Sequence, residues 1–143
     1  MKKKSSLKVQ IIVAEYYKDI TESLTKSAIK VLKDNKIDFD LIYVPGVYEI
    51  PQLIKWNINN NKVNLFIALG CVIKGQTYHF EVISDSVGKA LLDLVNNNPN
   101  TLISNGIINA YKKKQALDRS NSNHKNKGEE AANAMIRMIQ CLI

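Results

Sequence analysis

Cysteine, proline and arginine are scarce in this sequence. Its two cysteines, Cys71 and Cys141, form neither a CxxC motif nor a cluster with histidine that would suit zinc. This pattern excludes a disulfide scaffold, predicts no metal site and indicates reduced thiols, as in a cytoplasmic protein. With three prolines and six glycines among 143 residues, a collagen-like or low-complexity chain is excluded as well.

Long hydrophobic runs are also absent. The longest uncharged apolar run, Leu65–Ile73, is too short to cross about 30 Å of hydrocarbon as a helix. The apolar run near the start is interrupted by Lys8 and Gln10 and stops at Glu15, which does not fit a signal peptide. The sequence therefore predicts no membrane partner and a cytoplasmic location.

The charge balance is basic, but arginine contributes little to it. Among 20 basic and 13 acidic residues, which give a formal net charge of +7, only Arg119 and Arg137 are arginine. The lysine runs at 2–4 and 112–114 contain no interleaved aromatic residues for stacking on bases. We interpret the lysines as solvated surface charge and expect no nucleic-acid partner. A basic nucleic-acid protein is the less favoured interpretation, and it predicts steeply salt-dependent binding.

What the sequence does contain is a regular alternation of β-strand and α-helix patterns. Hydrophobic and charged contents of 45% and 23% are ordinary for a globular protein, and a chain of this length buries about 68% of its unfolded surface. We expect one domain over residues 1–143. Apolar runs rich in valine and isoleucine predict strands at Leu7–Ala14, Phe39–Val44, Leu65–Ile73 and Leu102–Ile108.

Apolar residues at helical spacing follow each strand. Asp19 and Glu22 predict a capping box at the start of the first helix, and Pro51 suits the first turn of the second. A long helix is expected after Gly75 and a short one over residues 115–119. The last helix is expected to bury a stripe made of Ala131, Ala132, Met135, Met138, Ile139 and Leu142.

This order of elements predicts a flavodoxin-like three-layer α/β/α sandwich with a four-stranded parallel sheet. Right-handed crossovers cover both faces of such a sheet with helices, and ligands bind beyond the carboxyl ends of its strands. We therefore expect the functional residues near the carboxyl ends of the strands, in the segments Tyr16–Asp19, Val44–Glu49, Gly70–His79 and Asn105–Ala110.

The segment Gly70–Thr77 is typical of a phosphate-binding loop, because it follows a strand and opens a helix. It differs from a Walker A motif in having Gln76 at the lysine position, and no strand ends in an aspartate for Mg²⁺. Hydrolysis of a nucleoside triphosphate is therefore disfavoured. Backbone amides at a helix start and the Thr77 hydroxyl still favour an anion such as phosphate. A glycine-marked strand exit with a threonine cap is the structural alternative.

Other residues near the strand ends are candidates for chemistry. His79 lies at the start of the same helix, where neutral imidazole is favoured and can accept a proton. Glu49 follows a proline-glycine turn and either accepts hydrogen bonds from a sugar or an amine, or is a favourable charge at a helix start. Tyr16 and Tyr17 either stack on a planar ring or cover the edge of the core.

Arg119 and Lys127 flank the last polar loop. In a chain that almost always uses lysine, an arginine indicates a bidentate carboxylate or phosphate partner, with a surface ion pair as the alternative. His124 lies within this loop and is interpreted as a surface residue.

Together these segments resemble the lumazine synthase family of riboflavin biosynthesis. The similarity covers nearly the whole chain through motifs in the same order, which are VPGVYEIP at Val44–Pro51, ALGCVIKGQTYHF at Ala68–Phe80, QALDR at Gln115–Arg119 and NKGEEA at Asn126–Ala131. The resemblance implies a transferase that condenses 5-amino-6-(D-ribitylamino)uracil with 3,4-dihydroxy-2-butanone 4-phosphate, releasing phosphate and giving 6,7-dimethyl-8-ribityllumazine. It implies no metal or organic cofactor.

The resemblance also implies roles for individual residues. His79 falls on the family's proton-transferring histidine, and Tyr16 on the aromatic position that stacks on the pyrimidine. The positions that bind the butanone phosphate are Gln76, Thr77 and Arg119. The positions that line the pyrimidine and the ribityl chain are Val47, Tyr48, Glu49, Cys71, Val72 and Ile73, with Asn105 as a further ring contact. Lys127 and Glu130 match polar residues near the site.

The chain departs from the family pattern at a few positions. Tyr16 replaces phenylalanine or tryptophan, Lys74 replaces a frequent arginine, and Asn105 replaces the phenylalanine of many members. None of these changes removes a group that the chemistry needs. The resemblance further implies a homopentamer or a multiple of pentamers with sites shared between subunits, and riboflavin synthase as a further partner. A flavodoxin-like module that binds a flavin without catalysis is the alternative.

Overall fold

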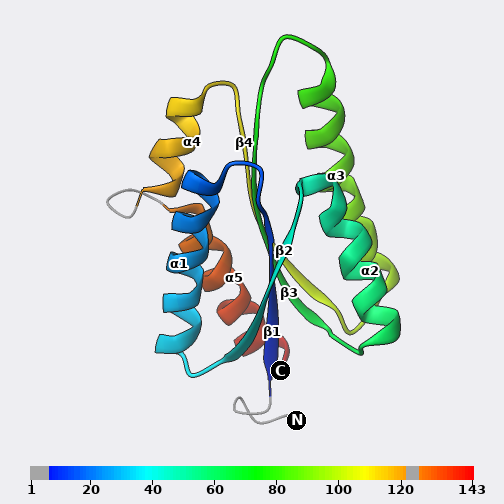
Figure 1. Cartoon of the computed structure of the whole chain (residues 1–143). Coiled ribbons are helices and arrows are strands. Elements are labelled where there is room, and N and C mark those ends of the chain that lie inside the picture. The colour runs from blue at the N-terminus through cyan, green and yellow to red at the C-terminus, as the bar shows by residue number, and fades with distance from the viewer. Residues whose placement is uncertain (1–6, 122–125) are drawn as a thin grey trace.

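The computed structural model describes residues 7–121 and 126–143. The elements follow the chain in the order β1 (Lys8–Ala14), α1 (Lys18–Asp34), β2 (Asp38–Val44), the 3₁₀ helix η2 (Val47–Glu49), α2 (Ile50–Asn60), β3 (Leu65–Ile73), α3 (His79–Asn97), β4 (Leu102–Ala110), α4 (Lys113–Ser120) and α5 (Lys127–Leu142). Figure 1 shows the strands between two groups of helices. The predicted alternation of strands and helices is confirmed.

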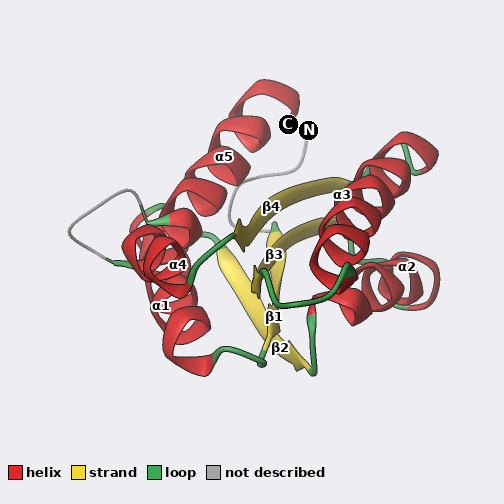
Figure 2. Cartoon of the chain, turned by 90° about the horizontal axis from the view of Figure 1, so that it is seen from above, coloured by secondary structure: helices red, strands yellow, loops and turns green. Residues whose placement is uncertain are grey.

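The strands in the described part of the chain form one sheet in the order β2-β1-β3-β4, and every neighbouring pair is parallel. Seen from above, α1, α4 and α5 cover one face of the sheet, and α2 and α3 cover the other (Figure 2). This arrangement is the three-layer α/β/α sandwich that the sequence predicts.

Two hydrophobic clusters fill the spaces between the sheet and its helical layers. Within β1, Val9, Ile11 and Val13 join the cluster under α1 and α5, whereas Ile12 and Ala14 join the cluster under α2 and α3. Side chains alternate between the two faces of a strand, and here both faces are covered. This is why the central strands β1 and β3 are buried almost throughout, whereas the edge strand β2 keeps exposed residues.

The predicted capping box at the start of α1 is wrong. The helix begins at Lys18 with Tyr17 as its N-cap, and no side chain caps it. Asp19 lies inside the first turn and pairs with Lys113 of α4 at 3.3 Å. The turn after β1 is shorter than expected, so the first intrahelical bonds go to the Tyr17 carbonyl and Asp19 lies two positions after the N-cap.

Two predictions near the end of the chain are corrected in part. Met138 and Leu142 are 43% and 62% exposed, whereas the rest of the predicted α5 stripe is buried. The stripe that packs on α1 and the sheet is narrower than the sequence pattern, because Met138 faces a groove beside β4. The fourth strand ends at Ala110 instead of Ile108, since pairing with β3 continues to Ile73↔Ala110.

A close approach between α1 and α5 fixes the position of the last helix. A Cβ atom on Gly128 would lie 2.1 Å from the Leu24 carbonyl oxygen, so only glycine fits there. The preceding Asn126 caps α5 by accepting a bond from the Glu129 amide at 3.0 Å, and its Nδ2 donates to the Ser120 carbonyl at 2.7 Å. The contact and the cap together place Lys127 at the start of α5.

We expect Gly128→Ala to destabilise the protein by about 2 kcal/mol or more, because the added methyl group forces α5 away from α1. Urea unfolding followed by circular dichroism measures the change. The matched control is Gly88→Ala on α3, where an added Cβ meets nothing within 4 Å; alanine should stabilise that helix by up to about 1 kcal/mol. An unchanged unfolding midpoint for Gly128→Ala would contradict the close packing of α1 on α5.

Candidate functional site

A cavity of about 610 Å³ lies beyond the carboxyl ends of β1, β2 and β3. The predicted site residues that line it are Tyr16, Val47, Tyr48, Glu49, Val72, Ile73, Thr77 and His79. They come from three of the four segments in which the sequence predicts functional residues. The fold thus brings together residues that are far apart in the chain.

The floor of the cavity depends on a close contact between β3 and η2. A Cβ atom on Gly70 would lie 2.5 Å from Cγ1 of Val47, so the absence of a side chain at Gly70 lets η2 pack onto the sheet. The amide of Glu15 donates to the Val44 carbonyl at 2.9 Å and ties the end of β1 to the end of β2. These contacts bring η2 and the turn after β1 to the same rim.

His79 is the first residue of α3, and its side chain is exposed at the cavity. Its backbone amide donates to Oγ1 of Thr77 at 3.4 Å. The N-cap position of α3 belongs to Tyr78, whose side chain makes no cap. The part of the structural alternative that makes Thr77 the N-cap is therefore wrong. Helix-start amides, a hydroxyl and an imidazole therefore meet here, a combination suited to holding an anion beside a proton carrier.

The opposite rim carries two exposed tyrosines and one carboxylate. Tyr16 is 77% exposed and makes an edge contact with Tyr17, with ring centroids 4.9 Å apart. Tyr17 packs against the core, and burial raises the pKa of its hydroxyl, with Tyr16 and Cys71 adding to the effect. Glu49 is half-buried at the N-cap of α2 without capping it. Its carboxylate therefore lines the cavity as an acceptor.

Cys71 does not share the cavity with its neighbour Val72. Its side chain lies in the core cluster under α1 and α5, on the opposite face of the sheet. Burial, followed by the charge of Asp19, raises the pKa of the thiol to about 12. A neutral, buried thiol cannot act as a nucleophile, so only the backbone of Cys71 is available to a ligand.

Four of the predicted residues lie away from this cavity. A second groove of about 450 Å³, called the β4 groove below, runs along β4 and α5 and is lined by Asn105, Lys127 and Glu130 among others. Arg119 is exposed on α4, where its guanidinium donates to the Gln115 carbonyl at 3.1 Å. Gln76 is exposed in the loop before α3 but does not line the cavity.

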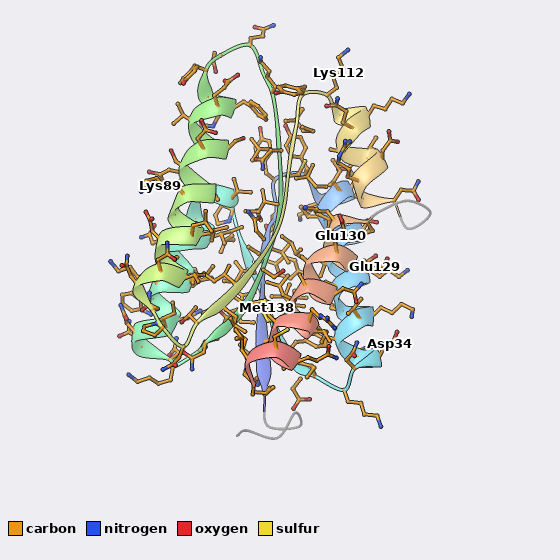
Figure 3. All side chains as sticks on the ribbon, turned by 180° about the vertical axis from the view of Figure 1, so that it is seen from behind. Asp34, Lys89, Lys112, Glu129, Glu130 and Met138 are labelled. Atoms are coloured by element: carbon orange, nitrogen blue, oxygen red, sulfur yellow. The ribbon has the colours of Figure 1, made fainter. Side chains whose placement is uncertain are left out.

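The fourth segment in which the sequence predicts functional residues, Asn105–Ala110, lies within β4 and does not line this cavity. Asn105 lies in the middle of β4, paired with Ala68, and the strand continues to Ala110. Its side chain accepts a bond from the Ile107 amide at 2.9 Å. Figure 3 shows Glu130 and Met138 on α5, on the side of the sheet opposite to Lys89 of α3. His124 lies outside the described residues.

Five further residues line the cavity and complete its wall, namely Tyr17, Gly46, Gly75, Phe80 and Ile83. Sequence reasoning proposed Tyr17 for ring stacking and placed Gly46 and Gly75 in segments at strand ends, but it gave Phe80 and Ile83 no place in a site. The proline-glycine turn and the helical spacing of Phe80 and Ile83 were signals for them, but both patterns also fit a purely structural role. Within residues 7–121 and 126–143, no group of three or more His, Cys, Asp or Glu side chains is placed to hold a metal ion, and no helix is long and apolar enough to cross a membrane.

The fold and the cavity are those of a parallel α/β protein, a class in which ligands bind beyond the carboxyl ends of the strands. A model of the 6,7-dimethyl-8-ribityllumazine synthase family matches residues 6–142. The chain belongs to this family, whose members are transferases of riboflavin biosynthesis.

Individual relatives of the same name align over most of their length. The protein from Bartonella bacilliformis is 40% identical over 131 residues, which cover 90% of this chain and 86% of the relative. The protein from Buchnera aphidicola subsp. Baizongia pistaciae is 37% identical over 145 residues, covering 97% and 89%. The protein from Kosmotoga olearia is 35% identical over 135 residues, covering 92% and 86%.

Labelling with a thiol reagent should separate the two cysteines. Cys141 is exposed and Cys71 is buried, and with a pKa of about 12 only about 10⁻⁴ of the Cys71 thiols are ionised at pH 8. We expect rapid labelling of Cys141 in the native protein and labelling of Cys71 only after denaturant is added. In the matched variant Cys141→Ser, fast labelling of the folded protein would show that Cys71 is accessible.

Proposed function

We propose that this chain condenses 5-amino-6-(D-ribitylamino)uracil with 3,4-dihydroxy-2-butanone 4-phosphate to form 6,7-dimethyl-8-ribityllumazine, and that the cavity beyond β1, β2 and β3 binds both substrates. The observation that carries the proposal is the meeting of His79 and Thr77 with Tyr16 and Glu49 around one cavity. Its volume of about 610 Å³ falls within the range of about 300–1,000 Å³ that is usual for small-molecule sites.

The rim with Tyr16 and Glu49 suits the pyrimidine substrate. An exposed tyrosine ring offers a flat surface for stacking, and the half-buried carboxylate of Glu49 accepts hydrogen bonds from the ribityl hydroxyls or ring amines. Apolar groups of Val47, Val72 and Ile73 line the same cavity. They exclude water from the ring without adding competing polar groups.

The start of α3 suits the phosphate substrate. The amides of the first helical turn carry partial positive charge, and the Thr77 hydroxyl and the Gln76 amide add donors in the same loop. His79 lies beside this anion site, where its imidazole can take the proton of the attacking amine and return it as water leaves. No covalent enzyme intermediate is needed, in agreement with the neutral Cys71 thiol.

Proximity is the main source of rate enhancement in this proposal. Holding two reactants together supplies effective molarities of about 10⁵–10⁸ M, whereas one general acid or base contributes about 10²- to 10⁴-fold. Departure of phosphate requires only that the anion be held in place. The cavity thus needs few ionisable groups.

We further propose that a complete site is formed by two copies of the chain. Asn105, Arg119 and Lys127 lie apart from the cavity, on β4, α4 and α5. A second copy that docks the surface formed by its β4, α4 and α5 against the cavity supplies these groups, and repetition of this contact closes a ring such as a homopentamer. The proposed partners are thus the substrates, further copies of the chain and riboflavin synthase, and the proposed location is the cytoplasm.

An absorbance assay for lumazine with both substrates, run beside a sizing column, tests this function. Formation of lumazine that depends on both substrates, by a protein that elutes as an oligomer, is the expected result. Yellow protein with bound flavin that forms no lumazine would favour a binding module instead.

We expect His79→Ala to lower kcat by about 10²- to 10⁴-fold, the contribution of one general acid or base, while leaving measurable turnover. Steady-state kinetics on a variant of unchanged oligomeric size provides the measurement. Complete loss of turnover in a correctly assembled variant would contradict the dominant role of proximity.

We expect Arg119→Ala to raise KM for the phosphate substrate by about 10- to 150-fold, because loss of charge-assisted hydrogen bonds costs about 1.5–3 kcal/mol. The control is Arg137→Ala on α5, which removes an exposed arginine that lines neither the cavity nor the β4 groove. An unchanged KM in the Arg119 variant would remove Arg119 from the site.

Mixed oligomers of the His79→Ala and Arg119→Ala chains distinguish a shared site from a site within one copy. In a shared site, some contacts between the two kinds of chain pair an intact cavity with an intact arginine, so activity rises above that of either variant. If each copy holds its own complete site, the mixture has only the average activity.

A further inference from the structure

An ion pair brackets the loop that carries the proposed phosphate donors. Lys74 directly follows β3, and Glu81 lies in the first turn of α3. Nζ of Lys74 lies 3.4 Å from Oε1 of Glu81. The segment 75–80 between them contains Gln76, Thr77 and His79, so the pair joins the two ends of this loop.

Lys74 is anchored by two further contacts. Its backbone amide donates to the Ala110 carbonyl at 2.9 Å, which continues the pairing of β3 with β4. Its ammonium group lies 5.6 Å from the centre of the Tyr111 ring, and that ring lies 5.8 Å from the ring of Phe80. The lysine therefore connects the ends of β3 and β4 to the start of α3.

Glu81 is held in a locally unfavourable position. Its side chain is only 30% exposed, and its second oxygen, Oε2, is buried without a hydrogen-bond partner in the described part of the protein, as is Oγ of Ser84 one turn later. A buried, unsatisfied carboxylate oxygen lowers stability. Such local costs are typical of functional sites, and here the ion pair with Lys74 orients the carboxylate.

The loop itself has few other restraints. Residues 74–79 are all exposed, and an added Cβ at Gly75 would meet no atom within 4 Å. Among the residues that the structure describes, the bonds near its end are those of the His79 amide to Thr77 and of the Val82 amide to the Tyr78 carbonyl, at 3.4 and 3.2 Å. Both bonds are local to the start of α3, whereas the ion pair joins the two ends of the loop.

We propose that Lys74 and Glu81 are positioning residues. Their ion pair fixes the two ends of the proposed phosphate-binding loop and so holds the Thr77 hydroxyl and the His79 imidazole at the spacing that phosphate departure requires. This inference rests on the proposed function. It assigns neither residue to direct contact with substrate. The rival assignment is that the Lys74 ammonium itself binds the phosphate.

Glu81→Gln distinguishes these two assignments, because it breaks the ion pair but keeps the positive charge of Lys74. If the pair positions the loop, KM for the phosphate substrate rises and kcat/KM falls by about 10-fold or more, since misplacement by about 1 Å can cost about 100-fold. KM for the pyrimidine substrate stays unchanged. If Lys74 binds phosphate directly, the released ammonium leaves KM for the phosphate substrate equal or lower, and the proposal is overturned.

The exchange variant Lys74→Glu/Glu81→Lys provides a second test, which remains informative even if the Glu81→Gln variant fails to fold. It restores an ion pair but moves the positive charge, so positioning predicts activity at least tenfold above that of either single reversal. Direct binding by Lys74 predicts no recovery. Lys74→Arg, which keeps the pair, should retain most of the activity.

A second ion pair on the same helix provides the matched control. Lys89 and Asp93 are 2.7 Å apart on α3, and both are exposed outside the cavity. The double variant Lys89→Gln/Asp93→Asn should leave both KM values and kcat unchanged. Thermal unfolding and elution volume identify any variant that fails to fold.

Two different results distinguish failure of the positioning role from failure of the proposed function. An unsubstituted protein that forms no lumazine contradicts the proposed function itself. An active protein in which Glu81→Gln and Lys74→Gln have unchanged kinetics overturns the positioning role and leaves the proposed function standing.

Discussion

The burial of β3 on both faces is the constraint on which the rest of this structure depends. Every residue of this strand except Ile73 is shielded from solvent, and its backbone is bonded to β1 on one side and β4 on the other. A parallel strand in this position cannot be joined to its neighbours by tight hairpins, so helical crossovers must cover both faces. The same connections bring the carboxyl ends of the strands to one edge, where the cavity lies.

Small side chains at a few positions allow the layers to approach closely enough to form the site. Gly70 lets η2 rest on β3, and Gly106 lets α5 rest on β4, where an added Cβ would lie 3.0 Å from Cβ of Ala131. Gly128 does the same for α5 on α1. Because packed interiors cannot absorb an extra methyl group without movement, these three glycines set the distances between helices and sheet. The rims of the cavity and of the β4 groove both follow from those distances.

The chemistry near the cavity is sparse in ionisable groups. Glu49 and His79 face it, whereas the Cys71 thiol is kept neutral in the core behind the sheet. The remaining polar residues of the family motifs lie along β4, α4 and α5. The proposed anion-binding loop thus lies on one surface and these polar groups lie on another. In the two-copy site that we propose, assembly is part of the chemistry, because neither surface alone carries the whole set.

The sequence by itself determined the type and order of the elements and the motifs at the strand exits. These properties are local: the period of two or of 3.6 residues, the proline-glycine turn before Val47 and the run Gly70–Thr77 are all visible within a few residues. Membership of the family could likewise be predicted, since it depends on motif order. Only the tertiary structure decided that Cys71 is the one that faces the core under α1 and α5 while Val72 faces the cavity, that Met138 faces a groove, and that Asn105 lies away from the cavity. The physical reason is that strand register and helix docking are set by contacts between residues far apart in the chain, which no short stretch of sequence contains.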